Sequence, residues 1–92
     1  MNDLVIKETI PSVDEYNNLR QAVSWHLLPE ERAELGLKSS LYTVAIYNEK
    51  QLVAMGRIVG DGQVYFYLQD LMVLPEYQHH GLGSTIMERL SN

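Results

Sequence analysis

The stretch Leu71–Ser84, LMVLPEYQHHGLGS, passes from an apolar strand pattern through a polar loop into a helix pattern. Gly81 and Gly83 stand at the mouth of that helix. The first N–H groups of a helix have no partner within it, and the helix dipole adds a partial positive charge there. Glycine lets a ligand approach the backbone without a Cβ in the way. The stretch therefore predicts a strand–loop–helix site for an anion, with phosphate the preferred ligand.

Three strand patterns are found near this stretch, of which two precede it and the third overlaps it. Tyr42–Tyr47, Leu52–Val59 and Val64–Leu74 are rich in β-branched and aromatic residues, which are enriched in strands. The polar segments Asn48–Gln51 and Gly60–Gln63 read as the turns between them. Because the strands are apolar on both alternating faces, we expect a sheet covered by helices on both sides.

A short strand and two helices are predicted in the N-terminal part of the chain. Leu4–Ile6 reads as the strand. Ser12 and Glu15 match a capping box, so the first helix is predicted to start there and to stop near Trp25. The second helix is predicted over Pro29–Gly36, with proline at its first position and glycine as its stop. The full order is β-α-α-β-β-β-α.

Composition limits the classes of function. The 92 residues suffice for one small domain. A net charge of −5 with seven scattered Lys and Arg argues against a nucleic-acid partner, which would need a basic patch. The lack of cysteine excludes disulfides, thiolate metal sites and Cys nucleophiles. No apolar run has membrane length and no leader opens the chain, so a cytoplasmic protein is expected.

The glycine pair alone does not identify the anion, and a tight structural turn would also use it. A Walker loop needs a lysine, but Gly83 is followed directly by Ser84 and Thr85. A dinucleotide fingerprint needs a third glycine where this chain has Ile86.

The pattern Val73-x-Pro75-x-x-Gln78-x-x-Gly81-x-Gly83 resembles the central acetyl-coenzyme A motif of the GNAT superfamily, the GCN5-related N-acetyltransferases. The order of one strand, two helices and a meander also matches that family. The resemblance implies an α/β (α+β) fold with a mixed, mostly antiparallel sheet and helices on both faces. It covers residues 1–92 as a single domain.

The resemblance also implies the cofactor and its site. Acetyl-coenzyme A would place its pyrophosphate on backbone N–H groups of the loop and its pantetheine arm beside the strand end. A backbone N–H near Met72 or Val73 would polarise the thioester carbonyl. The cofactor-binding residues that this implies are Leu71, Met72, Val73, Gln78, His79, His80, Gly81, Leu82, Gly83 and Ser84.

The implied reaction is transfer of an acetyl group to a primary amine of a small molecule or peptide, by direct attack of the amine on the thioester. The amine must first lose a proton, and Asp70 is the best-placed catalytic carboxylate. Alternatively, Asp70 braces a strand bulge. Trp25, Tyr65 and Tyr67 are candidate acceptor-binding residues, with core filling as the other interpretation. His79 and His80 could bind through side chain or main chain, and no metal site is predicted.

The family continues past this final helix with further strands and a helix, and these are absent from the 92 residues. We therefore expect a truncated domain whose last strand is an exposed edge. Such edges invite pairing, so a homo-oligomer formed by strand exchange is expected. A non-catalytic acyl-coenzyme A-binding or interaction module of the same fold is the alternative function.

Overall fold

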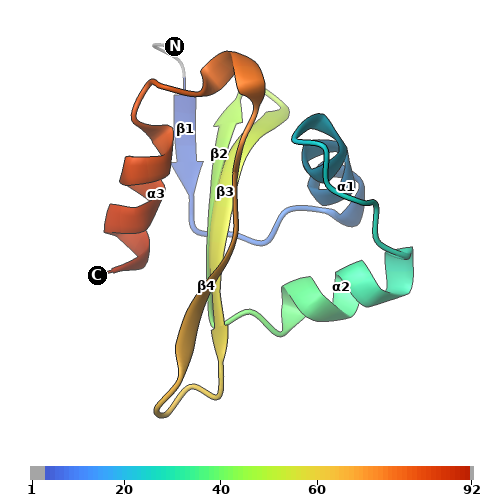
Figure 1. Ribbon diagram of the computed structural model, residues 1–92, viewed down its shortest axis with the longest axis vertical. Helices are drawn as coiled ribbons and strands as arrows, with labels where there is room; N and C mark the ends of the chain where they lie inside the picture. Colours follow the sequence, from blue (N-terminus) through green and yellow to red (C-terminus); the bar gives the residue numbers. More distant parts are fainter. Residues whose placement is uncertain (1–3, 92) are drawn as a thin grey trace.

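The computed structural model describes residues 4–91 and has the predicted order of elements (Figure 1). A short 3-10 turn, η1, is the one addition to that order, between the last strand and the last helix. The elements are β1 (Leu4–Lys7), α1 (Val13–Ala22), α2 (Glu30–Lys38), β2 (Tyr42–Asn48), β3 (Gln51–Gly60), β4 (Phe66–Val73), η1 (Pro75–Tyr77) and α3 (Leu82–Leu90).

The four strands form one sheet in the order β1-β2-β3-β4. All three pairings are antiparallel, so the described sheet is not mixed. The β2–β3 hairpin lies within one residue of its predicted bounds. The last strand is shorter than predicted, because β4 begins at Phe66 and ends at Val73. Val64 and Tyr65 belong to the turn, where Asp61 accepts hydrogen bonds from the N–H groups of Gln63, Val64 and Tyr65 at 2.8–3.0 Å.

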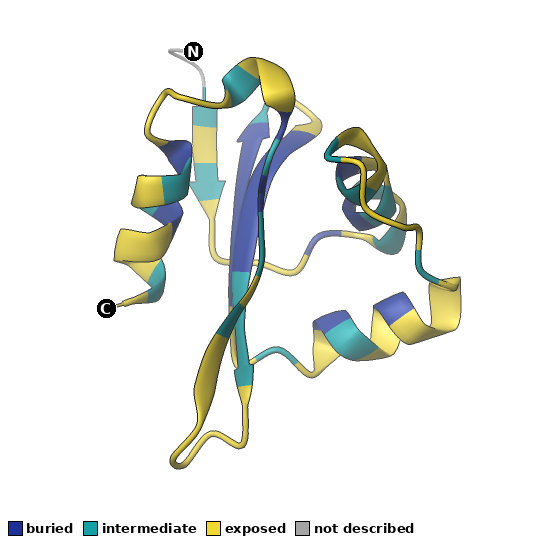
Figure 2. Cartoon of the chain, in the orientation of Figure 1, coloured by how far each residue is buried: buried dark blue, intermediate teal, exposed yellow. Residues whose placement is uncertain are grey.

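Helices cover both faces of the sheet, as the strand pattern predicts. Figure 1 shows α1 and α2 on one side of the sheet and α3 on the other. The buried residues concentrate in the middle of β2 and β3 and on the helix faces that meet them (Figure 2). The far end of the β3–β4 hairpin extends beyond the helices, and its residues are exposed. The α/β fold expected from the sequence is therefore confirmed.

The helix starts agree better with the sequence than the helix stops do. Ser12 caps α1 with its hydroxyl on the N–H of Glu15, whose carboxylate accepts from the Ser12 N–H, so the capping box is confirmed. The helix ends at Ala22 rather than at Trp25, because Ser24 adopts a left-handed φ of 67°. The predicted stop at Gly36 is wrong, since α2 continues to Lys38.

Gly56 allows α3 to lie close against the sheet. A Cβ at this position would lie 2.7 Å from Cγ2 of Ile86 and 3.2 Å from Cδ1 of Leu90. Ile86 is completely buried, and its β-branched side chain has little rotational freedom to move aside. The glycine is therefore required by the approach of helix to strand.

Gly56→Ala should lower the free energy of unfolding by about 1–3 kcal/mol, the usual cost of overpacking a core. Gly36→Ala is the matched control, because a Cβ at Gly36 meets no atom within 4 Å. That change should stabilise α2 by up to about 1 kcal/mol. Urea unfolding of both variants measures the difference. Equal free energies of unfolding for Gly56→Ala and Gly36→Ala would contradict the close contact between Gly56 and Ile86.

Candidate functional site

The loop between β4 and α3 is folded back on the end of the strand. The N–H of Leu74 still donates to the carbonyl of Val53 at 2.9 Å, and the N–H of Tyr77 closes η1 on the carbonyl of Leu74 at 2.8 Å. The Gln78 side chain then donates through Nε2 to the carbonyl of Val73 at 3.0 Å. Gln78 thus ties the loop to the strand end. A long amide side chain at this position, three residues before Gly81, can reach back to the strand and donate to its last carbonyl.

The backbone at the start of α3 leaves several N–H groups without a protein partner. Gly81 caps the helix with a left-handed φ of 83°, and His79 has a φ of 67°. The first helical hydrogen bond runs from the N–H of Thr85 to the carbonyl of Gly81 at 3.0 Å. The N–H groups of Leu82, Gly83 and Ser84 therefore have no intrahelical acceptor.

The N-terminus of α3 differs from those of the other two described helices. The first turn of α1 carries Asp14 and Glu15, and that of α2 carries Glu30 and Glu31. The first turn of α3 contains no acid, and no side chain caps it. Acids at a helix start compensate the positive end of the dipole. The positive end of α3 is thus left free for an outside anion.

These groups surround a hollow of about 280 Å³ at the end of the sheet. Its walls come from the strand end, the loop and the first turn of α3. They consist of Val73, Tyr77, Gln78, His79, Gly81, Leu82, Gly83 and Ser84. A Cβ added at Gly81 or at Gly83 would meet no atom within 4 Å, so both glycines face open space. His79 and His80 are exposed. Seven of the ten residues expected to bind cofactor line this hollow, and Leu71 and Met72 precede Val73 along β4.

Asp70 lies in a bulge of β4. The register passes from Met55 opposite Met72 to Arg57 opposite Gln69, so two residues of β4 face the single residue Gly56. Asp70 is one of those two and has a left-handed φ of 56°. This conformation is rare for a residue with a side chain and costs roughly 1–3 kcal/mol, so neighbouring contacts must hold it.

Three donors hold the Asp70 carboxylate. Oδ2 accepts from Nε of Arg57 and from the hydroxyl of Tyr16, both at 2.6 Å, and Oδ1 lies 3.4 Å from a guanidinium nitrogen of Arg20. The carboxylate side chain is only 8% exposed. Burial, and then the hydrogen bond and charge of Asp70, raise the pKa of Tyr16 above its ordinary value. With both oxygens engaged, the geometry favours the bracing role of Asp70 over the role of a base.

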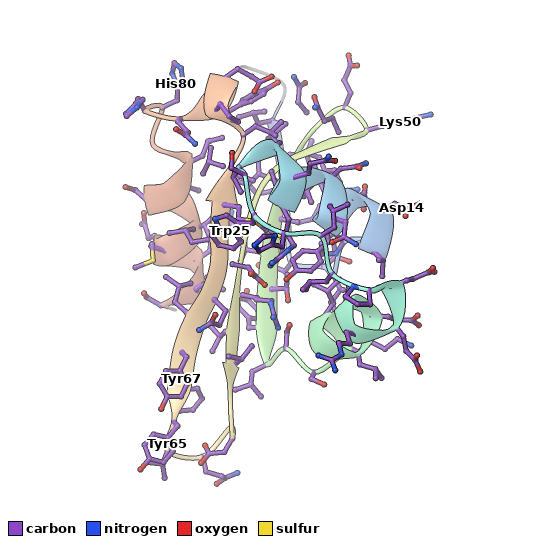
Figure 3. The ribbon with its side chains drawn as sticks, turned by 45° about the vertical axis from the view of Figure 1, so that its right-hand side comes forward. Asp14, Trp25, Lys50, Tyr65, Tyr67 and His80 are labelled. Atoms are coloured by element: carbon purple, nitrogen blue, oxygen red, sulfur yellow. The ribbon has the colours of Figure 1, made fainter. Side chains whose placement is uncertain are left out.

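The candidate acceptor residues occupy two separate places. Figure 3 shows Trp25 beside the middle of the sheet, Tyr65 and Tyr67 near the hairpin end, and His80 at the opposite end of the molecule. The two tyrosine rings stack with centroids 6.4 Å apart, and they are 59% and 54% exposed. Trp25 is 42% exposed. Core filling is therefore wrong for all three residues, while an acceptor role for them stays a prediction.

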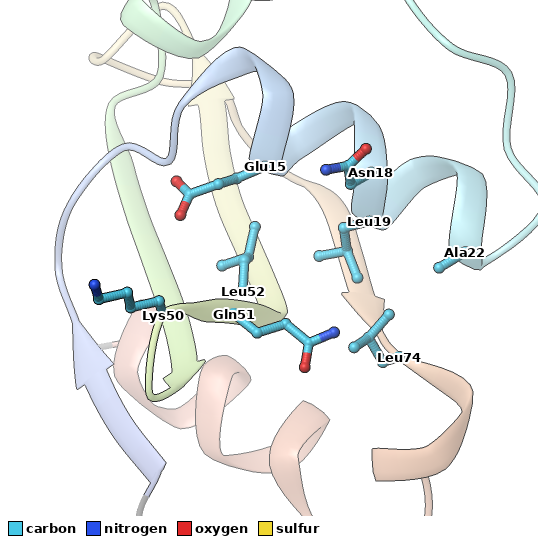
Figure 4. A pocket seen from close by; sticks show the side chains of 8 residues that line it. All are labelled: Glu15, Asn18, Leu19, Ala22, Lys50, Gln51, Leu52 and Leu74. Carbon is cyan, nitrogen blue, oxygen red and sulfur yellow. The ribbon is translucent and has the colours of Figure 1, made fainter.

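A second hollow, of about 340 Å³, lies between α1 and the β2–β3 turn (Figure 4). Its polar groups include Glu15 and Lys50, and Leu19, Leu52 and Leu74 form apolar walls. Glu15 is already bonded to the N–H of Ser12 and to the hydroxyl of Tyr47 at 3.1 Å. This acid therefore holds α1 in place and is not free for a substrate.

Among residues 4–91, no helix combines the length and apolar character that crossing a membrane demands. The same range contains no group of three or more His, Cys, Asp and Glu side chains suited to a metal ion.

Residues 10–92 match the family model of the acetyltransferase (GNAT) family. The chain belongs to the GNAT family. A GNAT relative from Arabidopsis thaliana, the chloroplastic GCN5-related N-acetyltransferase 1, is 31% identical over 81 residues. These residues make up 86% of this chain and 41% of the plant protein. The chain thus spans less than half of this relative.

Solved structures have the same GNAT fold. A protein from meticillin-resistant Staphylococcus aureus, described as a probable acetyltransferase, superposes with a TM-score of 0.90 at 36% identity. The match covers 96% of this chain and 66% of that one. An aminoglycoside 6′-N-acetyltransferase complexed with coenzyme A matches with a TM-score of 0.77 over 94% of this chain and 52% of that one, and at 17% identity it shows the fold alone.

Asp70→Asn tests the bracing role. It removes the negative charge between two poorly exposed guanidiniums, and we expect the free energy of unfolding to fall by about 3 kcal/mol, as for a broken buried ion pair. Glu76→Gln is the control, because Glu76 is an exposed loop acid whose replacement should change stability by less than about 0.5 kcal/mol. Equal unfolding midpoints in denaturant would show that Asp70 does not brace the bulge.

Tyr47 gives a pH dependence with a defined sign. Burial, followed by the charge and hydrogen bond of Glu15, raises the pKa of Tyr47 from 10.0 to about 12. The stabilisation from the neutral hydroxyl is fully present below the unfolded pKa of about 10 and is lost as the pH rises through about 12. Thermal unfolding between pH 9 and 12 should show this loss. Tyr47→Phe should make the decline shallower, and an unchanged decline would rule out Tyr47 as its source.

Proposed function

We propose that the chain binds acetyl-coenzyme A at the β4–α3 junction and transfers the acetyl group to a primary amine. The observation that carries this proposal is the uncompensated N-terminus of α3, which opens on the hollow beside the end of β4. The free N–H groups of Leu82, Gly83 and Ser84 would bind the pyrophosphate, since charge-assisted hydrogen bonds are the strong ones.

The outer edge of β4 is the proposed place for the pantetheine arm. β4 is the last strand of the described sheet, and its only strand partner is β3. Main-chain groups along Leu71–Val73 on the outer edge would pair with the amides of the arm much as another strand would. One of these N–H groups would then donate to the thioester oxygen, where negative charge develops during attack.

The proposed reaction needs an amine in its neutral form. The amine nitrogen attacks the thioester carbonyl carbon, and the carbon–sulfur bond breaks as the tetrahedral intermediate collapses. The nitrogen loses a proton to solvent or to a base, and the thiolate that leaves takes up a proton. Asp70 remains the candidate base, because it directly precedes Leu71–Val73 along β4. Its three donors favour the bracing role.

For the acceptor, we propose a primary amine of a small molecule or a peptide. Trp25 supplies an exposed aromatic wall, and the stacked pair Tyr65 and Tyr67 supplies a second one. Aromatic faces attract cations, and a net charge of −5 favours cationic molecules. The outer edge of β4 is also open to pairing with a second copy of the chain, which would compete with the pantetheine arm for the same main-chain groups.

A non-catalytic acyl-coenzyme A-binding module is the second candidate. It is favoured by the state of Asp70, because both oxygens of this carboxylate already accept hydrogen bonds. Binding of acetyl-coenzyme A without release of free thiol in the presence of amines would decide for it. The chain contains no cysteine, so thiol release can be followed with a disulfide reagent without background from the protein.

Gly83→Val tests the binding site. A Cβ at Gly83 would meet no atom within 4 Å, so the larger side chain would fill space that the ligand is proposed to occupy. We expect acetyl-coenzyme A to bind about 10- to 100-fold more weakly, as for the loss of one hydrogen bond to a charged group at about 1.5–3 kcal/mol. Calorimetric titration measures the change. Gly36→Val is the matched control, since Gly36 is also a helical glycine whose Cβ would meet open space.

Unchanged affinity in Gly83→Val, or equal losses in both variants, would contradict the site. Absence of acetyl-coenzyme A binding by the unaltered protein would refute the proposed function as a whole.

A further inference from the structure

The side chain of Arg20 contacts two separate parts of the proposed site. Its guanidinium lies 3.4 Å from Oδ1 of Asp70 in the β4 bulge. Its Nε donates to the carbonyl of His26 at 2.7 Å, and its guanidinium carbon lies 5.3 Å from the centre of the Trp25 ring. Only 14% of the Arg20 side chain is exposed. One side chain on α1 thus joins the strand proposed to bind the acetyl donor to the loop proposed to face the amine.

The segment Trp25–Leu27 has few other contacts that could hold it. All three residues are exposed. Within the described residues, Arg20 makes the only side-chain hydrogen bond to this segment, and the N–H of Trp25 donates to the main-chain carbonyl of Arg20 at 2.8 Å. The loop is fixed again at Leu28, whose N–H and carbonyl both bond to the Asn17 side chain at 3.0 Å. The position of Trp25 therefore depends on Arg20.

The bulge, in contrast, does not depend on Arg20 alone. Arg57 and Tyr16 each contact Asp70 at 2.6 Å, which is shorter than the contact of Arg20. Arg57 is anchored in turn to the carbonyl of Gly36 and the hydroxyl of Ser40. A change at Arg20 should therefore release the loop while the bulge keeps its shape.

We propose that Arg20 is a positioning residue that sets the placement of the Trp25–Leu27 loop relative to the β4 bulge, and with it the placement of the amine relative to the thioester. This inference rests on the proposed function for its catalytic meaning. The planar guanidinium is suited to the task because it donates in several fixed directions at once, whereas the ammonium of lysine is a point charge without that fork. Small displacements of reacting groups are costly, and about 1 Å can reduce the rate 100-fold.

Arg20→Lys tests the inference while keeping a positive charge near Asp70. We expect the Trp25 amide to exchange faster with solvent, because the turn that it closes on Arg20 loses its side-chain support. The Leu28 amide, held by Asn17, is the internal control and should exchange unchanged. Trp25 is the only tryptophan, so its fluorescence should also be quenched more strongly by acrylamide and shift to longer wavelength.

Kinetics with spermidine and a lysine peptide as probe amines give the functional readout. We expect kcat/KM for the amine to fall about 10- to 100-fold in Arg20→Lys, mainly through a lower kcat, because the reacting groups would be misplaced. The calorimetric Kd for acetyl-coenzyme A should stay within about twofold, less than 0.5 kcal/mol. Arg32→Lys is the matched control, because Arg32 is an exposed arginine of α2 with no hydrogen bond or ion pair among the described residues.

The outcomes separate the two proposals. Unchanged exchange and quenching of Trp25 in Arg20→Lys, with turnover of the unaltered protein intact, would overturn the role of Arg20 and leave the proposed function standing. Equal weakening of acetyl-coenzyme A and amine binding would also overturn it, since that result points to a general structural loss. If the unaltered protein neither binds acetyl-coenzyme A nor releases thiol, the proposed function fails, and the catalytic meaning of Arg20 fails with it.

Discussion

The contact of Asp70 with Arg57 is the constraint on which the rest of the site depends. Asp70 occupies a left-handed backbone position at the β4 bulge, and a residue with a side chain takes that position only when its surroundings hold it there. Arg57 projects from the neighbouring strand to do so and is itself held by the end of α2. Tyr16 and Arg20, both on α1, contact the same carboxylate. Both helices on this face of the sheet are thereby tied to the one irregular point of the last strand.

On the other face of the sheet, two residues bring the N-terminus of α3 beside the end of β4. Gly56 lets α3 approach the sheet closely, and Gln78 bends the connecting loop back to Val73. The N-terminal turn of α3 is then left at the rim with its N–H groups unused. The bulge at Asp70 and the N-terminus of α3 thus lie at neighbouring parts of the last described strand.

Much of the fold could be predicted from the sequence, because its strongest signals are local. The capping box at Ser12 and Glu15, the β2–β3 hairpin and the helix after Gly81 all depend on residues close together in the chain. The stop of α2 was mispredicted because a helical glycine ends a helix only where the backbone turns left-handed, and at Gly36 it does not. The glycine pair with Val73, Pro75 and Gln78 was sufficient to indicate the family.

The contacts of Asp70 could not be predicted, since its partners lie 54, 50 and 13 residues away in the sequence. Nothing in the local pattern reveals that two arginines from different elements will meet one aspartate. Arg57 could be recognised only as a charge on an otherwise apolar strand, and such a charge is usually paired when buried. The exposure of Tyr65 and Tyr67 also escaped prediction, because strand alternation does not show where the covering helices end.

The bare N-terminus of α3 has a consequence for the protein when no ligand is bound. The other two described helices carry acids in their first turn that compensate the positive end of the helix dipole. In α3 only a bound anion could have this effect. Its first turn should therefore be the part of α3 that opens most readily in the empty protein. A ligand that fills the site would raise the melting temperature in proportion to the logarithm of its concentration. The protein's resistance to heat and proteolysis would then depend on how much of that ligand is present.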